Sequence, residues 1–328
     1  VERSQAIVGE QGEKNGYSVS ISDDGDTVAV SSYDQPVVAI YDWNSGNTSW
    51  EQRGSDITRS NAGNEYGRSI SLSADGNRIA IGSPGFNSSE SDPQVGSVQV
   101  YTWNSGDTSW NELGAALDGE HPSDQSGLSV SLSSDGLVLA VGEPYHDPQD
   151  GGSEYPPADD GSEPPADDGS QTPIENAGSV RLYRFDAAAG EWKQIGDRIN
   201  GIHESGFSGY SVALSEDGSV VAIGAPGVEA SKGAARVFEL DDTDPDKQQW
   251  KWIPKGTGIL GYGDGDQFGW SITLSNDGNL LAVGSPGNYN NSGAVELYIW
   301  DDQIATPDWQ NTGYIWSDSG DSQDWDNY

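Results

Sequence analysis

Few residues in this 328-residue chain have the types and spacing that acid–base or metal chemistry needs. It contains no cysteine, and its three histidines are His121, His146 and His203. None of them lies in a zinc-ligand or hydrolase spacing, and a thiol nucleophile is excluded. The serines alternate with large apolar residues and have no neighbouring base, and no pair of carboxylates stands out from the acidic background. We therefore predict no catalytic residue and no enzyme.

Closely spaced aspartates are the candidates for a cation site. One group comprises Asp23, Asp24 and Asp26, and the other comprises Asp264 and Asp266. Calcium takes six to eight oxygen ligands, more than such a short turn supplies. The favoured interpretation is a structural role, in which the Asp side chains form hydrogen bonds with the backbone of their own turns. We predict no required cofactor and keep calcium as the alternative.

Tryptophans are the best candidates for a binding surface. Two pairs are separated by short turns, Trp43 with Trp50 and Trp103 with Trp110, and Trp300 and Trp309 occupy the corresponding region near the C-terminus. Aromatic pairs of this kind stabilise a hairpin by about 0.2–1 kcal/mol, so a structural role is the first interpretation. Contact with a sugar ring or with a partner protein is the functional alternative.

The element that must position all these residues is a segment whose sequence is repeated five times. One copy is Gly209–Pro226, and the repeat cores begin at Gly16, Gly67, Gly127, Gly209 and Gly269. Each core alternates serine with apolar residues, which predicts a strand, and continues through Asp-Gly, which predicts a tight turn. A second strand then follows, with an alanine between large apolar residues.

Two further strands follow in each repeat, for example at residues 98–103 and from Trp110. Four antiparallel strands in a unit of about 50–60 residues are typical of a propeller blade. We predict an all-β propeller of five four-stranded blades over residues 1–316, with the first strand near the axis. The alternative is five blades of a larger, for example seven-bladed, propeller. Residues 2–8 look like an outer strand, and we expect them to close the five-bladed ring.

Two segments fall outside the repeat pattern. An insertion rich in Pro, Asp and Gly covers residues 146–176, and an acidic arm covers residues 317–328. Such composition cannot bury a core, so both are expected to be solvated excursions.

The net charge restricts the partners. With 15 Lys and Arg against 53 Asp and Glu, it is 15 − 53 = −38, which repels nucleic acid and anionic lipid. No apolar stretch is long enough to span a membrane. Three sequons, at Asn47, Asn87 and Asn290, predict N-glycosylation in loops. The absence of methionine, even at position 1, suggests a processed or excised part of a longer product.

The repeats resemble those of the FG-GAP family. The resemblance rests on Phe268-Gly269-Trp270-Ser271, on Gly224-Ala225-Pro226-Gly227 and on a glycine before the third strand, and it covers residues 10–316. It implies a propeller like that of integrin α subunits, with a role in adhesion and usually without catalysis. Calcium ligands in this family lie in a long loop between the first two strands, whereas this loop is only Ser-x-Asp-Gly here.

From these observations we predict a non-catalytic, extracellular or cell-surface structural module that mediates adhesion. Its partner would be another protein or a further copy of itself. The alternative is a lectin-like propeller that binds glycans through its rim tryptophans.

Overall fold

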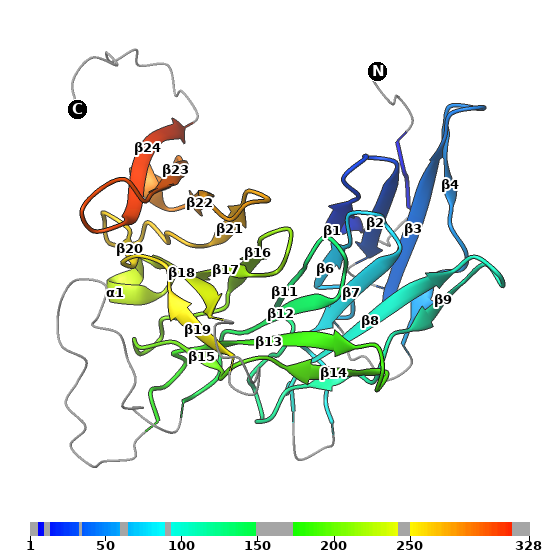
Figure 1. Cartoon of the computed structure of the whole chain (residues 1–328), viewed down its shortest axis with the longest axis horizontal. Coiled ribbons are helices and arrows are strands. Elements are labelled where there is room, and N and C mark those ends of the chain that lie inside the picture. Colours follow the sequence, from blue (N-terminus) through cyan, green and yellow to red (C-terminus); the bar gives the residue numbers. More distant parts are fainter. Residues whose placement is uncertain are drawn as a thin grey trace.

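The computed structural model describes residues 6–9, 14–32, 35–59, 65–88, 93–148, 173–241 and 250–316. Its strands form five antiparallel sheets in chain order, each a blade, arranged as an arc around a common axis (Figure 1). Two single-turn helices, α1 (Val228–Ser231) and α2 (Asn288–Asn291), follow the second strands of blades 4 and 5. Among these residues no helix has the length and apolar character needed to cross a bilayer.

The strand bounds repeat closely from blade to blade. Blade 1 contains β1 (Asn15–Ile21), β2 (Thr27–Ser32), β3 (Val37–Asn44), β4 (Ser49–Gln52) and β5 (Ile57–Thr58). Blade 2 contains β6 (Ser69–Leu72), β7 (Arg78–Ser83), β8 (Ser97–Asn104), β9 (Ser109–Glu112) and β10 (Leu117–Asp118). Blade 3 contains β11 (Ser129–Leu132), β12 (Val138–Glu143), β13 (Ser179–Asp186), β14 (Glu191–Gln194) and β15 (Ile199–Asn200). Blade 4 contains β16 (Ser211–Leu214), β17 (Val220–Ala225), β18 (Ala234–Asp241), β19 (Lys251–Pro254) and β20 (Ile259–Leu260). Blade 5 contains β21 (Ser271–Leu274), β22 (Leu280–Ser285), β23 (Ala294–Asp301) and β24 (Asp308–Trp316).

The prediction of five four-stranded antiparallel blades is confirmed. The first strand of each blade lies innermost, and the fourth lies at the rim. In blades 1 to 4 the fourth strand is divided into two short segments that both pair with the third strand, whereas in blade 5 it is the continuous strand β24.

The Asp-Gly hairpins show why the repeated sequence folds in this way. In blade 1 the Ser22 hydroxyl accepts a hydrogen bond from the Thr27 amide at 2.9 Å and donates one to Asp24 at 2.7 Å. Gly25 has φ +71°, a value that glycine adopts without strain. The same Ser–Asp pair closes the hairpin in all five blades, so these residues build the scaffold.

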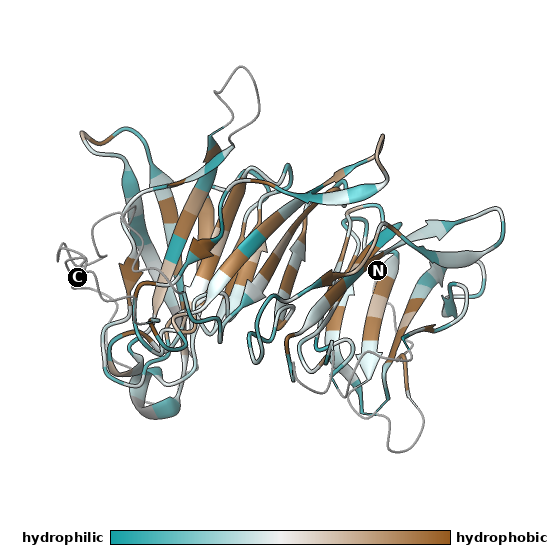
Figure 2. Ribbon diagram, turned by 90° about the horizontal axis from the view of Figure 1, so that it is seen from below, coloured by the Kyte–Doolittle hydropathy of each residue, from teal (hydrophilic) through white to brown (hydrophobic). Residues whose placement is uncertain are grey.

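The core lies between neighbouring blades. Apolar residues concentrate on the strands and polar residues on the turns (Figure 2). The alanines in the second strands of blades 1 to 4 are fully buried, where the sheets approach one another: Ala29, Ala80, Ala140 and Ala222. Burying apolar surface at these contacts is the main stabilising contribution, at about 25 cal/mol per Å².

The arc is open between blade 5 and blade 1. Contacts between innermost strands join β1 to β6, β6 to β11, β11 to β16 and β16 to β21. On the outward side of blade 1, Val19 and Ile21 are exposed to solvent. Closure by residues 2–8 is not seen: residues 6–9 form no strand, and residues 1–5 lie outside the described part.

Candidate functional site

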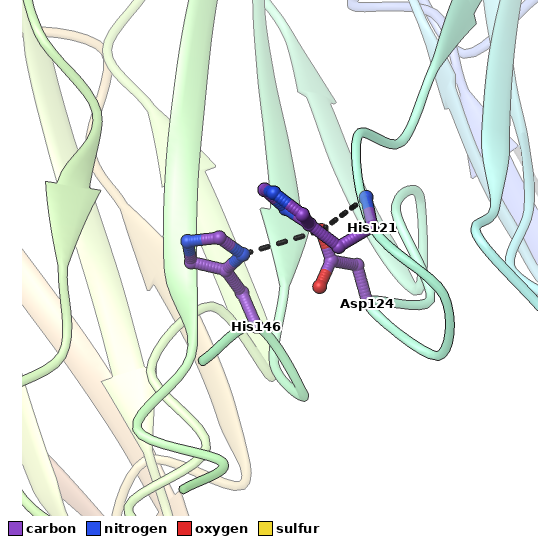
Figure 3. Close-up of side chains that lie close together, drawn as sticks. All are labelled: His121, Asp124 and His146. Carbon is purple, nitrogen blue, oxygen red and sulfur yellow. Dashed lines mark hydrogen bonds and ion pairs between the residues drawn. The ribbon is translucent and has the colours of Figure 1, made fainter. Parts of the chain in front are cut away.

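Two histidines and an aspartate from two segments meet at one end of blade 3 (Figure 3). His121 and Asp124 lie in the linker between β10 and β11, and His146 follows β12. Within the described ranges these three residues are the one group of three or more His, Cys, Asp and Glu side chains whose ligand atoms all lie within 4.8 Å of one another.

Asp124 is held by its own turn. Its carboxylate oxygen Oδ2 accepts a hydrogen bond from the His121 backbone amide at 3.2 Å, and its side chain is almost completely buried. The linker between blades 4 and 5 contains the same turn, in which Asp266 accepts from the Gly263 amide at 2.8 Å. The hydrogen bond within the turn therefore explains the position of Asp124. The histidines distinguish this linker from the one between blades 4 and 5.

His146 bridges Asp124 to Arg198. Its Nδ1 lies 3.2 Å from Asp124 Oδ2, and its Nε2 lies 2.6 Å from Arg198 Nη1. The guanidinium of Arg198 can only donate, and its Nη1 lies 2.6 Å from Nε2 and 3.2 Å from Nδ1. The shorter contact favours the tautomer in which Nε2 accepts from Arg198 and Nδ1 donates to the Asp124 carboxylate.

His121 presents its ring to solvent. Its side chain is 51% exposed, and its Nδ1 lies 3.5 Å from the same Asp124 oxygen. Its ring centroid is 5.5 Å from that of His146. An exposed imidazole beside a buried carboxylate is an arrangement that general acid–base catalysis uses.

A network of buried charges supports this group from the side of β13. The completely buried Glu143 carboxylate accepts hydrogen bonds from Arg181 Nε at 2.8 Å and from the Ser179 hydroxyl at 3.1 Å. Arg198 Nη2 lies 3.3 Å from Glu143 and 2.7 Å from Glu120. Burial alone would lower the pKa of Arg181, but the combined effect of Glu143, Tyr183 and Glu120 outweighs it and raises that pKa. Arg181 is therefore a fixed cation.

A metal ion would not suit this donor set as it stands. The spacings of 3.2 and 3.5 Å from Asp124 Oδ2 to the two Nδ1 atoms are close to those around a tetrahedral zinc ion. However, coordination through His146 Nδ1 would move its proton to Nε2, against the Arg198 donor. The arrangement favours a hydrogen-bonded Asp–His–Arg relay instead.

Comparison of the repeats shows that this chemistry belongs to blade 3. Glu143 occupies the position of Ser83, Ala225 and Ser285 in blades 2, 4 and 5, and His146 that of Phe86, Val228 and Asn288. In the sequence His121 and His146 lie in no zinc-ligand or hydrolase spacing, so their proximity was not predicted. The departure of these two positions from the repeat pattern is the signal that could have found it.

The aspartates predicted as cation ligands serve the backbone wherever their contacts are described. Asp24 accepts from the Ser22 hydroxyl and the Asp26 amide, and Asp266 accepts from Gly263. Asp23 donates its amide to Ala74 of the next blade at 3.0 Å. None of the predicted aspartates belongs to the described group of potential metal ligands, which includes only Asp124. Calcium binding stays a prediction.

The predicted tryptophan pairs form across the hairpins. The rings of Trp43 and Trp50 lie 5.3 Å apart, those of Trp103 and Trp110 5.4 Å, and those of Trp300 and Trp309 5.6 Å. Trp110 Nε1 donates to the Arg53 carbonyl of the preceding blade at 3.0 Å. At least part of this set therefore packs between blades, and a role in ligand binding stays a prediction.

The sequons lie in exposed turns where they are described. Asn47 donates to Glu51 at 2.6 Å, and Asn87 accepts from the Gln94 amide at 2.6 Å. The side chain of Asn290, most of the insertion and the acidic arm lie outside the described residues. Glycosylation and an extracellular location stay predictions.

Known structures share this fold at low sequence identity. A putative 6-phosphogluconolactonase from Bacteroides uniformis superposes with a TM-score of 0.56 and 11% identity, over 91% of this chain and 71% of that one. One from Bacteroides fragilis gives 0.53 and 11%, over 90% and 71%. A protein from Lactobacillus plantarum gives 0.53 and 12%, over 91% and 73%. No family model and no curated protein matches the chain, so the FG-GAP resemblance is supported only as far as a β-propeller.

These comparisons contradict two expectations. We expected a non-catalytic adhesion module and no enzyme, but two of the superposed propellers are named as putative 6-phosphogluconolactonases. The His121–Asp124–His146 group is assembled from separate segments, so no motif within one segment indicates it.

Proposed function

We propose that the chain is a hydrolase that opens a lactone of a sugar acid at the end of blade 3. The observation that carries this proposal is the exposed His121 ring beside the buried Asp124–His146–Arg198 relay, 3.5 Å from the shared carboxylate. The names of the structural neighbours suggest the substrate class.

The residues suit general-base hydrolysis. A water molecule would lose its proton to His121 Nε2 while its oxygen attacks the lactone carbonyl, and Asp124 would stabilise the resulting imidazolium. The carbonyl oxygen then carries negative charge, and Arg198 is the partly exposed cation of the cluster that can face it. When the carbonyl re-forms, the bond to the ring oxygen breaks. That oxygen takes the proton back from His121, which leaves an open-chain hydroxy acid.

The charge of the chain favours an uncharged lactone. With a net charge of −38, the surface repels a phosphorylated substrate at long range. Arg181 and Arg198 are balanced by Glu120 and Glu143, so the cluster has no net positive charge to attract a dianionic phosphate, although Arg198 can still donate a hydrogen bond to a single oxyanion. Gluconolactone should therefore be hydrolysed faster than its 6-phosphate.

The test is lactone hydrolysis followed by pH-stat titration, with the spontaneous rate subtracted. His121→Gln should lower kcat about 100-fold or more, as expected for loss of a general base. His203→Gln is the matched control, because His203 occupies the same position in the next linker. Absence of hydrolysis above the spontaneous rate with either lactone, or an equal loss in the two variants, would contradict the proposal.

The carboxylate can be tested separately. Asp124→Asn keeps an oxygen that can accept from the His121 amide but removes the charge that stabilises the imidazolium. We expect an unchanged melting temperature and a kcat at least tenfold lower, while Asp266→Asn in the equivalent turn leaves kcat unchanged.

A further inference from the structure

A cavity of about 350 Å³ lies at the rim between blades 3 and 4. Its walls come from the ends of β13 and β14 in blade 3 and from Trp250 in blade 4. The candidate active site is supported at the start of β13, through Ser179 and Arg181, whereas the cavity lies at residues 184–186, where the same strand ends. The volume is in the range of small-molecule sites, which combine apolar walls with a few polar groups.

Arg184 brings an unpaired cation to this cavity. Its guanidinium carbon lies 4.2 Å from the centre of the Trp250 ring, which is a cation–π contact between the two blades. Among the described residues, its side chain has no hydrogen-bond acceptor and no carboxylate partner. Arg53, which lies over Trp103 in a similar way, is also paired with Asp42 at 3.5 Å.

Trp250 brings a second unpaired donor. Its Nε1 is buried and has no acceptor in the described part of the chain. Trp252, two positions further along, donates from its own Nε1 to the Ile195 carbonyl at 2.9 Å. Buried N–H groups are nearly always paired, so the Trp250 donor calls for an acceptor from outside the chain.

The other groups around the cavity are apolar or already paired. Phe185 and the buried Ile195 are apolar. Asp186 accepts from Lys193 Nζ at 2.7 Å and from the Ala188 amide at 2.9 Å. The charges of Asp186 and Lys193 balance one another, so the unmatched groups of the cavity are one cation and one N–H donor.

The repeat does not require the contact between Arg184 and Trp250. The strand registers place other residue types at the same two positions of the remaining boundaries between blades. The corresponding pairs are Asp42 with Thr108, Thr102 with Gly190 and Glu239 with Pro307. Three boundaries therefore form without an arginine or a tryptophan here, and the pair is specific to this cavity.

We propose that the cavity binds a small aromatic carboxylate. One carboxylate oxygen accepts from Arg184 and the other from Trp250 Nε1, while the ring of the ligand lies against Phe185 and Ile195. Hydrogen bonds between a guanidinium and a carboxylate are charge-assisted and among the stronger ones in proteins. The net charge of −38 repels anions at long range, but at 0.15 M salt charges more than about 8 Å away are largely screened, so the nearby Arg184 dominates.

The test is isothermal titration calorimetry of the full chain with indole-3-acetate at 0.15 M salt. We expect binding at a single site. Indole-3-acetamide has the same ring without the charge, and it should bind at least about tenfold more weakly, because a hydrogen bond to a charged group is replaced by a neutral one. Equal affinity for the acid and the amide, or no binding of the acid, would overturn the proposal.

The variants take residues that the repeat already accepts at these positions. Arg184→Thr copies Thr102 and Trp250→Thr copies Thr108, so both should keep the melting temperature of the wild type and lose at least about tenfold in affinity for indole-3-acetate. Trp250→Phe keeps an aromatic face and removes only the donor, and should also weaken binding.

Two controls remove positive charge elsewhere. Lys251→Met acts directly beside Trp250 but outside the cavity, and Arg198→Met acts at the candidate active site. Both should bind indole-3-acetate as the wild type does. Unchanged binding in Arg184→Thr, or a loss in Arg198→Met equal to that in Arg184→Thr, would refute the assignment of the ligand to this cavity.

Discussion

Replacing Gly142 by alanine should destabilise the propeller strongly, because this glycine lies against the backbone of the next blade. An added Cβ would lie 2.0 Å from the Gly209 carbonyl oxygen. Ordinary contacts begin at 3.4 Å, so the two blades would have to separate by 3.4 − 2.0 = 1.4 Å at this point. That oxygen also accepts a hydrogen bond from Ser129 at 2.8 Å, which the separation would break.

The expected cost combines two contributions. Overpacking a tight contact costs about 1–3 kcal/mol, and loss of one hydrogen bond costs about 0.5–1.5 kcal/mol. We therefore expect the free energy of unfolding to fall by about 2–4 kcal/mol. At roughly 2 °C per kcal/mol for a chain of this size, the melting temperature should fall by about 4–8 °C, measured by thermal denaturation followed by circular dichroism.

Gly284 provides the matched control, because it holds the same position in blade 5. A Cβ there would meet only groups of Ser271, chiefly its hydroxyl, and no backbone of a following blade. The serine side chain can rotate away, so Gly284→Ala should cost about 1 kcal/mol or less. Equal losses of stability in the two variants would refute the reasoning, and would show that blade 5 is covered in solution.

Three other measurements test local features. Burial raises the pKa of Glu296, so ionisation of this carboxyl opposes folding. The free energy of unfolding should therefore fall as the pH rises above the pKa of the unfolded chain, about 4.3. In urea denaturation, Glu296→Gln should be more stable than the wild type at pH 7 but not at pH 4. Ser215→Ala should cost about 1–3 kcal/mol, because the buried Val220 amide loses its acceptor at 2.9 Å, and a cost below 0.5 kcal/mol would contradict this. Arg198→Met frees His146 Nε2 to carry the proton, so zinc should raise the melting temperature of this variant and leave that of the wild type unchanged. Stabilisation of the wild type by zinc would show that the assigned tautomer is wrong.

The features that the sequence predicts correctly are local. The turn after Ser22 is determined within six residues, and Trp43 meets Trp50, which lies seven positions further along the same hairpin. In such cases the strand period and the turn type fix which side chains face one another. Repetition then extends each local result to the other blades.

The candidate site depended on information that is not local. His121 and His146 are 25 residues apart and come together because a linker and the end of β12 reach the same end of blade 3. Their proximity follows only once the register of the blades is known. Asp124 could not be identified as a site residue for a different reason. An aspartate in a turn is common, and only its contact with His146 distinguishes it from the others.

The blades contact one another in a linear series, and this arrangement determines where local unfolding begins. When each unit contacts only its neighbours, its resistance to local unfolding depends on how many neighbours it has. Blades 1 and 5 each contact one neighbour, whereas blades 2, 3 and 4 each contact two, and blade 3 lies farthest from both ends. Fraying should thus begin at both ends of the arc and reach the middle last, so amide hydrogen exchange should be slowest in blade 3. The histidine cluster lies in the blade that opens last.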